Sequence, residues 1–179
     1  AVWKIAPALL AGNTVVVKPS PLTPLAVQEL AAVTEAAGLP AGVLNIVHGD
    51  VDAGSALAAH PDVDFITFTG SSDVAGKVAA AAGANLTPVM AELGGKSASV
   101  VLPDADLRLA IKGSLFSGLM NNGQTCVSTT RILLPADRYE EAVELATEYT
   151  RQLVVGDPAD MATDVGPLIS ARQQRSVAA

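Results

Sequence analysis

The sequence predicts an α/β fold built on a parallel sheet that helices cover on both faces. The first observation is an alternation, since short β-branched runs are followed by alanine-rich runs with apolar residues at helical spacing. The second is the continuous apolar run at residues 15–17, because strands buried on both faces lose the alternation of apolar and polar residues. The third is size, since half of the 179 residues are apolar, which is enough for a sizeable core.

The first half of the chain shows a βαβαβ order, which indicates a doubly wound sheet. Its predicted elements are a strand within 13–20, a helix over 24–38, a strand within 42–49, a short helix over 53–61, a strand within 63–71, a helix over 73–83 and an apolar strand ending near residue 92. Pro24 lies near the start of the first helix and Gly38 at its end, where each residue type is favoured.

The second half follows a Gly-Gly pair, and we expect a domain boundary near Gly94 and Gly95. An amphipathic helix over 105–120 is predicted to end at residues 121–123, where a glycine can adopt a left-handed turn. The later elements are a strand within 128–135, a helix over 138–153, a turn at 155–160 and the start of a further helix. We expect the chain to be a segment of a longer protein.

Composition excludes several classes of function. The net charge is −7 and no cluster of Lys and Arg occurs, which argues against binding nucleic acid or an anionic membrane. A single cysteine excludes an internal disulfide framework and suits a reducing compartment, so we expect a cytoplasmic protein. His48 and His60 are isolated, and we expect both to be structural, with no metal site. No secretory leader or transmembrane span is predicted.

Two strand ends carry polar residues that suit a ligand. Residues 68–76 place a glycine and two serines before a helix, where free N–H groups and the helix dipole favour a phosphate. The alternative is a tight turn in which Ser71 or Ser72 only caps the helix. Lys18 and Ser20 follow another strand, at the edge where open α/β sheets bind ligands. A solvated lysine before a proline turn explains them equally well.

Glu92 and Cys126 are the candidate chemical groups. Glu92 ends an otherwise apolar strand, so it is either a charge at a sheet edge or a general base whose pKa is raised by partial burial. The flanking apolar residues favour the base. Cys126 lies in a loop past a helix, outside any periodic core pattern. Free cysteines are more often core residues than nucleophiles, and the loop position weakens that interpretation.

Six elements of the chain occur in the order and spacing of the aldehyde dehydrogenase superfamily. They are PALLAGNTVVVKPS, GLPAGVLNIVHG, HPDVDFITFTGS, ELGGKS, NNGQTC and GDPADMATDVGPLIS, of which the ELGGK and GQTC elements are the most specific. The chain therefore resembles that superfamily from end to end. The resemblance implies a Rossmann-like parallel sheet segment of a cofactor-binding domain at 1–94, and the first part of an α/β catalytic domain at 95–179.

The resemblance assigns chemical roles to both candidate groups. Cys126 matches the nucleophile, whose thiolate attacks the aldehyde carbon, gives a thiohemiacetal and then a thioester. Glu92 matches the general base that activates water to release the carboxylic acid. The backbone N–H of Cys126 is expected to form half of the oxyanion hole.

The resemblance also assigns a binding site for NAD or NADP. Lys18, with Ser20 beside it, resembles the residue that hydrogen-bonds the adenosine ribose, and Gly70 with Ser71 meets the pyrophosphate at the helix start. Gly94 resembles the glycine that lets the nicotinamide approach the catalytic part closely, because a side chain there would intrude.

Two positions depart from the family pattern. Pro21 replaces an acidic residue that in many members holds the ribose hydroxyls and repels a 2′-phosphate, so either NAD or NADP fits. Ala75 replaces a glycine, with Gly76 one position later, and its methyl group could tighten the helix against the cofactor.

Other expectations concern the whole protein. The family's side-chain oxyanion donor and the glutamate that steadies the nicotinamide ribose fall outside residues 1–179, so we expect this segment to be inactive, or nearly so, on its own. We expect a small-molecule aldehyde as substrate, and a homodimer or homotetramer for the parent enzyme. The alternatives are a coenzyme A-acylating aldehyde dehydrogenase, which generally lacks the glutamate found here as Glu92, and a non-catalytic nucleotide-binding or structural relative. The presence of Cys126 and Glu92 argues against the second alternative.

Overall fold

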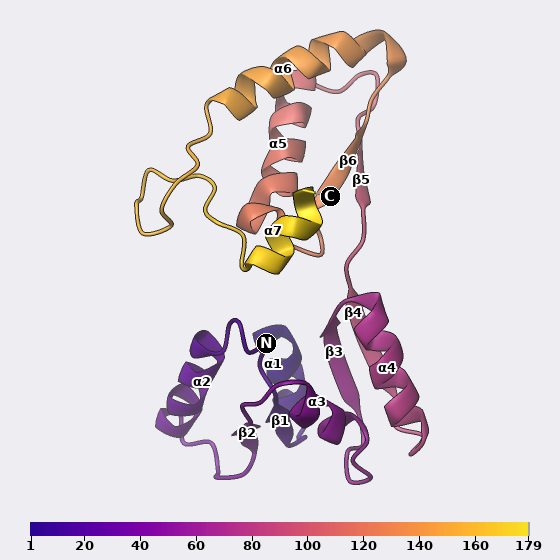
Figure 1. Ribbon diagram of the computed structural model, residues 1–179, viewed down its shortest axis with the longest axis vertical. Helices are drawn as coiled ribbons and strands as arrows, with labels where there is room; N and C mark the ends of the chain where they lie inside the picture. The colour runs from indigo at the N-terminus through magenta and orange to yellow at the C-terminus, as the bar shows by residue number, and fades with distance from the viewer. Residues whose placement is uncertain (179) are drawn as a thin grey trace. The chain divides into compact units, whose positions relative to one another are not determined.

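The computed structural model describes residues 1–178 and divides the chain into two compact units, Ala1–Leu93 and a second that begins at Gly94. Both units contain helices and parallel strand pairs, which confirms the predicted α/β class (Figure 1).

The first unit contains four helices and four strands. In order they are α1 (Val2–Leu10), β1 (Val15–Val17), α2 (Leu25–Ala36), β2 (Leu44–Ile46), α3 (Val51–Ala58), β3 (Ile66–Gly70), α4 (Ser72–Gly83) and β4 (Val89–Leu93). The strands pair in parallel as β1 with β2 and β3 with β4. Within each pair the carboxyl ends of the strands therefore lie at the same edge, which is where the predicted ligand residues occur.

Helix α1 is the element of the first unit that the sequence patterns missed. Pro7 lies inside it and lacks the N–H that would donate to the carbonyl of Trp3, so a proline at this place normally ends or bends a helix. The helix nevertheless continues to Leu10 and buries Ile5, and the chain then turns at Gly12, whose φ is +82°. Burial of one apolar face outweighs the local preference here.

The second unit builds its core around two helices and one strand pair. Its elements are β5 (Ser97–Val100), α5 (Leu107–Leu119), the 3₁₀ helix η1 (Met120–Gly123), β6 (Thr129–Leu133), the 3₁₀ helix η2 (Ala136–Arg138), α6 (Tyr139–Arg151) and α7 (Ala171–Ala178). Strands β5 and β6 are parallel. Val101, Leu107, Ile111 and Ala142 are buried together, with further apolar side chains of α5, α6 and β6 packed around them.

Helix α5 carries the chain from this core to the predicted nucleophile. It begins at an aspartate cap, because Asp106 Oδ1 accepts a hydrogen bond of 3.1 Å from the N–H of Leu109. It ends at Leu119, and the chain then turns through η1, in which Asn121 and Asn122 have non-helical φ and ψ. The core therefore anchors the helix that leads into the loop of Cys126.

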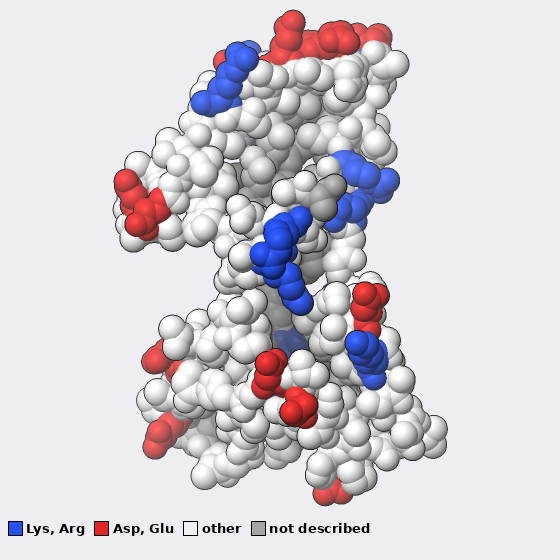
Figure 2. All heavy atoms as spheres, viewed as in Figure 1, with Lys and Arg blue, Asp and Glu red and all other residues white. Residues whose placement is uncertain are grey.

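Acidic side chains gather over α6, a helix with four glutamates (Figure 2). Within residues 1–178, no helix combines the length and apolar character that crossing a membrane requires. The same residues contain no cluster of three or more His, Cys, Asp or Glu side chains that could bind a metal ion.

Candidate active site

Lys18 lies at the carboxyl edge of the β1–β2 pair, as the sequence predicts. Its Nζ donates to the carbonyl oxygens of Pro19 at 2.7 Å and of Gly49 at 3.2 Å. Its stem passes over Gly54, since a Cβ atom there would lie 3.5 Å from Lys18 Cε. An ammonium has three N–H donors, and these two carbonyls take two of them. One donor remains for an acceptor outside the chain.

Ser20 and Pro21 form the turn that follows β1. The N–H of Thr23 donates to the carbonyl of Ser20 at 3.1 Å, and the N–H of Leu22 donates to Ser20 Oγ at 3.2 Å. Pro21 thus occupies the second position of a β-turn, which proline favours because its φ is already set. Proline is therefore favoured by the local turn at this position.

Ser71 caps α4 at the carboxyl end of β3. Its Oγ accepts a hydrogen bond of 3.4 Å from the N–H of Val74, so Ser71, and not Ser72, is the capping residue. Gly70 is packed against its own strand, since a Cβ there would meet the ring of Phe68 at 2.5 Å. The first turn of α4 keeps the positive end of its dipole and N–H groups without partners inside the helix, as an anion requires.

Ala75 is buried in α4, with 6% of its surface exposed. The neighbouring Gly76 lies in open space, since nothing is within 4 Å of a Cβ built on it. The methyl group of Ala75 therefore packs inside the first unit.

Glu92 lies on the face of the β3–β4 pair that also carries two threonines. It pairs with Thr69 across the strands, and Thr67 points to the same face two residues earlier. Glu92 is exposed, so the partial burial expected from its apolar neighbours is absent. The flanking residues alternate between faces, and they therefore do not cover this carboxylate.

Lys4 is a residue of this face that the sequence analysis did not single out. Its Nζ donates to Thr67 Oγ1 at 2.7 Å. Burial lowers the pKa of Lys4 below its ordinary value, and the negative charge of Glu92 partly opposes that shift. Lys4 was not predicted because it lies in α1, and Pro7 argues against a helix at this place in the sequence.

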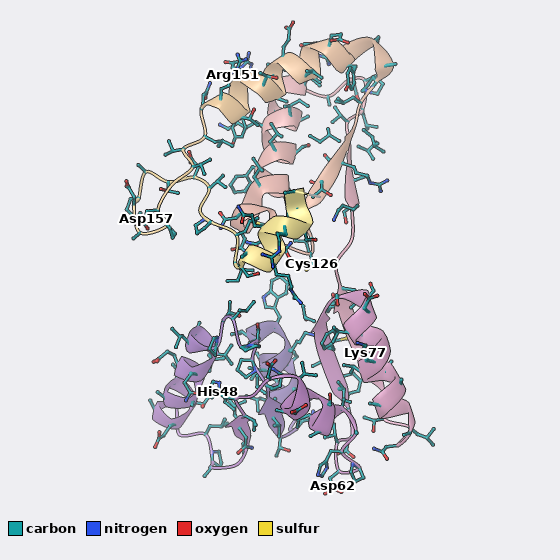
Figure 3. All side chains as sticks on the ribbon, in the orientation of Figure 1. His48, Asp62, Lys77, Cys126, Arg151 and Asp157 are labelled. Atoms are coloured by element: carbon teal, nitrogen blue, oxygen red, sulfur yellow. The ribbon has the colours of Figure 1, made fainter. Side chains whose placement is uncertain are left out.

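Cys126 is exposed on the loop between η1 and β6 (Figure 3). The preceding residues Asn121, Asn122 and Gly123 all have positive φ, at 52°, 58° and 72°. The left-handed end predicted near Gly123 is confirmed, and it extends over two asparagines, which tolerate this region better than other residues with a side chain. The thiol is thus presented by a sharply turned loop and not packed as a core residue.

The loop before Cys126 is tied to a segment far along the chain. Asn122 Oδ1 accepts a hydrogen bond of 2.7 Å from the N–H of Gly166, and Asn122 Nδ2 donates to the carbonyl of Pro167 at 3.1 Å. Gln124 Oε1 accepts from the N–H of Ile169 at 3.1 Å. The sequence shows both segments, and an Asn-Asn-Gly run is a signal for left-handed backbone, but no local pattern connects the two.

Gly94 lies next to open space, because no atom within 4 Å would meet a Cβ built there. Within the first unit, the remaining donor of Lys18 and the capped start of α4 are a cationic donor and a helix N-terminus, which are groups of the kind that bind the ribose and phosphates of a dinucleotide. The residues present fit NAD or NADP. Glu92 belongs to the first unit and Cys126 to the second.

Comparison with known proteins identifies the family. The family model described as "Aldehyde dehydrogenase family" matches residues 1–179. The chain belongs to the aldehyde dehydrogenase family. It is 50% identical to geranial dehydrogenase of Castellaniella defragrans over 176 residues, which cover 98% of this chain and 37% of that protein. It is 44% identical to betaine aldehyde dehydrogenase of Vibrio vulnificus, over 95% of this chain and 35% of the relative.

Solved structures of aldehyde dehydrogenases have the same fold. An aldehyde dehydrogenase of Mycobacterium tuberculosis complexed with NAD+ is 51% identical, with a TM-score of 0.93 over 97% of this chain and 36% of that one. Aldehyde dehydrogenase C of Pseudomonas syringae, as a cysteine-to-alanine variant complexed with NAD+ and octanal, is 42% identical with a TM-score of 0.93, again over 97% and 36%. The chain thus spans little more than a third of the length of these relatives.

Proposed function

We propose that the whole protein oxidises an aldehyde to a carboxylic acid with NAD or NADP, using Cys126 as nucleophile and Glu92 as general base. The observation that carries the proposal is the exposed thiol of Cys126 on a sharply turned loop, in a chain that matches the family model over its full length. We also propose that the first unit belongs to the cofactor-binding domain and the second to the catalytic domain.

The proposed cofactor is NAD or NADP. Related structures contain NAD+ or NADP, which supports both. Lys18 and Ser20 would hold the adenosine ribose, and Gly70 and Ser71 the pyrophosphate. Gly94 would leave room for the nicotinamide half. When bound, the oxidised nicotinamide supplies the acceptor for the hydride that leaves the former aldehyde carbon.

Cys126 starts the reaction as a thiolate that forms a C–S bond with the aldehyde carbon. The aldehyde oxygen becomes an anion, and the backbone N–H of Cys126, which no acceptor within residues 1–178 takes, is available to stabilise it. Loss of hydride leaves a thioester. Glu92 then takes a proton from a water molecule that attacks the thioester, the C–S bond breaks, and the acid and the thiolate are released. The balance is aldehyde, water and oxidised cofactor giving acid, reduced cofactor and one proton.

The test is a kinetic comparison of the whole protein with its Cys126→Ala and Glu92→Gln variants, using a panel of aldehydes and measuring reduced cofactor by absorbance. We expect Cys126→Ala to lose turnover by about 10³-fold or more, because the nucleophile is gone. Glu92→Gln should keep a burst of reduced cofactor and lose the steady rate, because only thioester hydrolysis needs the base. Full turnover by Cys126→Ala would overturn the proposal.

A further inference from the structure

The loop before Cys126 holds an uncommon backbone conformation. Asn121 and Asn122 are two of the three residues other than glycine that have positive φ within residues 1–178, and they are adjacent. Backbone of this kind carries a free-energy cost and persists where surrounding contacts hold it. The contacts that hold this loop therefore also determine where Cys126 lies.

The side chain of Asn122 is the main long-range contact of that loop. Both ends of its amide are used, by the N–H of Gly166 and the carbonyl of Pro167, which lie 44 and 45 positions later. Gln124, on the other side of Gly123, adds the bond to Ile169. The pair brackets the left-handed glycine and fastens the loop to residues 166–169.

Asn121 provides a matched contrast within the same turn. It has nearly the same backbone conformation, with φ of 52° against 58° for Asn122. Its amide, however, donates only to the carbonyl of Gln124, at 3.3 Å and within the loop itself. Removing the side chain of Asn121 therefore leaves the bonds to residues 166–169 intact, and removing that of Asn122 breaks two of them.

We propose that Asn122 is a positioning residue for Cys126, whose amide fastens the nucleophile loop to residues 166–169 and so holds the thiol where it reacts. The inference rests on the proposed role of Cys126. Its physical basis is that catalysis falls steeply with misplacement, by about 10²-fold for a shift of about 1 Å. A thiol that moves with a loosened loop still meets its substrate, but seldom in the reactive geometry.

The experiment compares three variants in the whole protein. Asn122→Gly removes both bonds and keeps the left-handed backbone favourable, since glycine adopts positive φ without strain. Asn122→Asp keeps an acceptor for the N–H of Gly166 and loses the donor to Pro167. Asn121→Gly is the control with the same backbone change and no long-range bond. Steady-state kinetics, the cofactor burst and the rate of Cys126 alkylation by iodoacetamide are measured for each.

The expected pattern separates positioning from folding. Asn122→Gly should lower kcat by about 30-fold and change KM by less than about threefold. The loss in kcat of Asn122→Asp, expressed as log kcat, should be at least about a third smaller than that of Asn122→Gly. The kcat of Asn121→Gly should stay within about threefold of the parent value. The inference would be overturned if Asn122→Gly had the same kcat as the parent protein, or if Asn122→Gly and Asn121→Gly lost kcat equally. If Asn122→Gly does not fold, Asn122→Asp decides, since unchanged kcat and alkylation rate there contradict it.

The two proposals fail in different ways. If the parent protein shows no turnover that depends on Cys126, the proposed function is wrong. If turnover depends on Cys126 but not on Asn122, only the positioning role is wrong.

Discussion

The two units of this chain position their candidate groups by different means. In the first unit, Lys18, Ser71 and Glu92 lie at or near the ends of parallel strands, so strand register and a helix start place them. In the second unit, Cys126 lies on a loop whose shape depends on hydrogen bonds to residues 44 and 45 positions later. Strand ends and a helix start thus place the proposed binding residues, whereas the loop of the proposed nucleophile is held by side-chain hydrogen bonds to a distant segment.

The two units also differ in how their apolar residues are packed. The buried apolar residues of the first unit are Ile5, Pro19 and three alanines, Ala58, Ala75 and Ala82. The second unit buries Val101, Leu107, Ile111 and Ala142 as one contiguous cluster, and α5 runs from it to the nucleophile loop. The unit with the proposed nucleophile thus supports its loop on a packed core, as a reactive group held at fixed geometry requires.

The largest effect that can break this comparison is a core truncation in each unit. Ile111→Ala should cost about 3 kcal/mol, and Ile5→Ala about 1.5 kcal/mol, because Ile111 is 2% exposed inside a cluster and Ile5 is 7% exposed without one. Hydrogen exchange in the whole protein, read from peptides of α5 and α1, measures the opening free energy of each region separately. An equal or larger loss in α1 would mean that the first unit is as tightly packed as the second.

A smaller effect tests the proposed adenosine-ribose site at the end of β1. Pro21→Glu should lower kcat/KM with NADP about tenfold and leave the value with NAD within about twofold, because a carboxylate near the adenosine ribose repels a 2′-phosphate by roughly 1.4 kcal/mol. Pro21→Ala is the control, since it loosens the turn without adding charge. Initial rates with both cofactors give the ratio, and the same ratio in both variants would place the adenosine ribose elsewhere.

The smallest effect concerns the pH dependence that Lys4 adds to the first unit. Its pKa is lowered by burial, so the unfolded chain holds the proton more tightly than the folded chain. The resulting cost to the free energy of folding is full at neutral pH. It shrinks as the pH rises through the pKa of Lys4 in the folded chain and is gone above the pKa in the unfolded chain.

Lys4→Met removes that titration. The stability of the parent relative to the variant should therefore rise in this alkaline window, by at most about 0.5 kcal/mol because water screens a partly exposed ammonium. Hydrogen exchange of α1 peptides at pH 7.5 and pH 10 checks the sign. A parent that loses stability relative to Lys4→Met at the higher pH contradicts it.

Local patterns predicted most of the fold because each pattern has a local cause. The continuous apolar run of β1, the spacing in α2 and the glycine at the end of η1 each reflect the preferences of a few neighbouring residues. Helix α1 was missed for the opposite reason, since Pro7 contradicts a helix locally and burial of Ile5 overrides it. Because Lys4 lies in this helix, neither its position nor its contact with the face of Glu92 was predicted.

The sequence by itself determined the α/β class, the order of the elements, the family and the residues proposed for chemistry, because these follow from periodicity, turn residues and motifs that lie within short stretches. Only the tertiary structure decided that Glu92 is exposed and that Lys18 donates two hydrogen bonds to carbonyls near the strand ends. It also decided that Asn122 connects the loop before Cys126 to residues 166–169 by hydrogen bonds. Exposure and long-range hydrogen bonds depend on which distant residues come together, and no local preference encodes that.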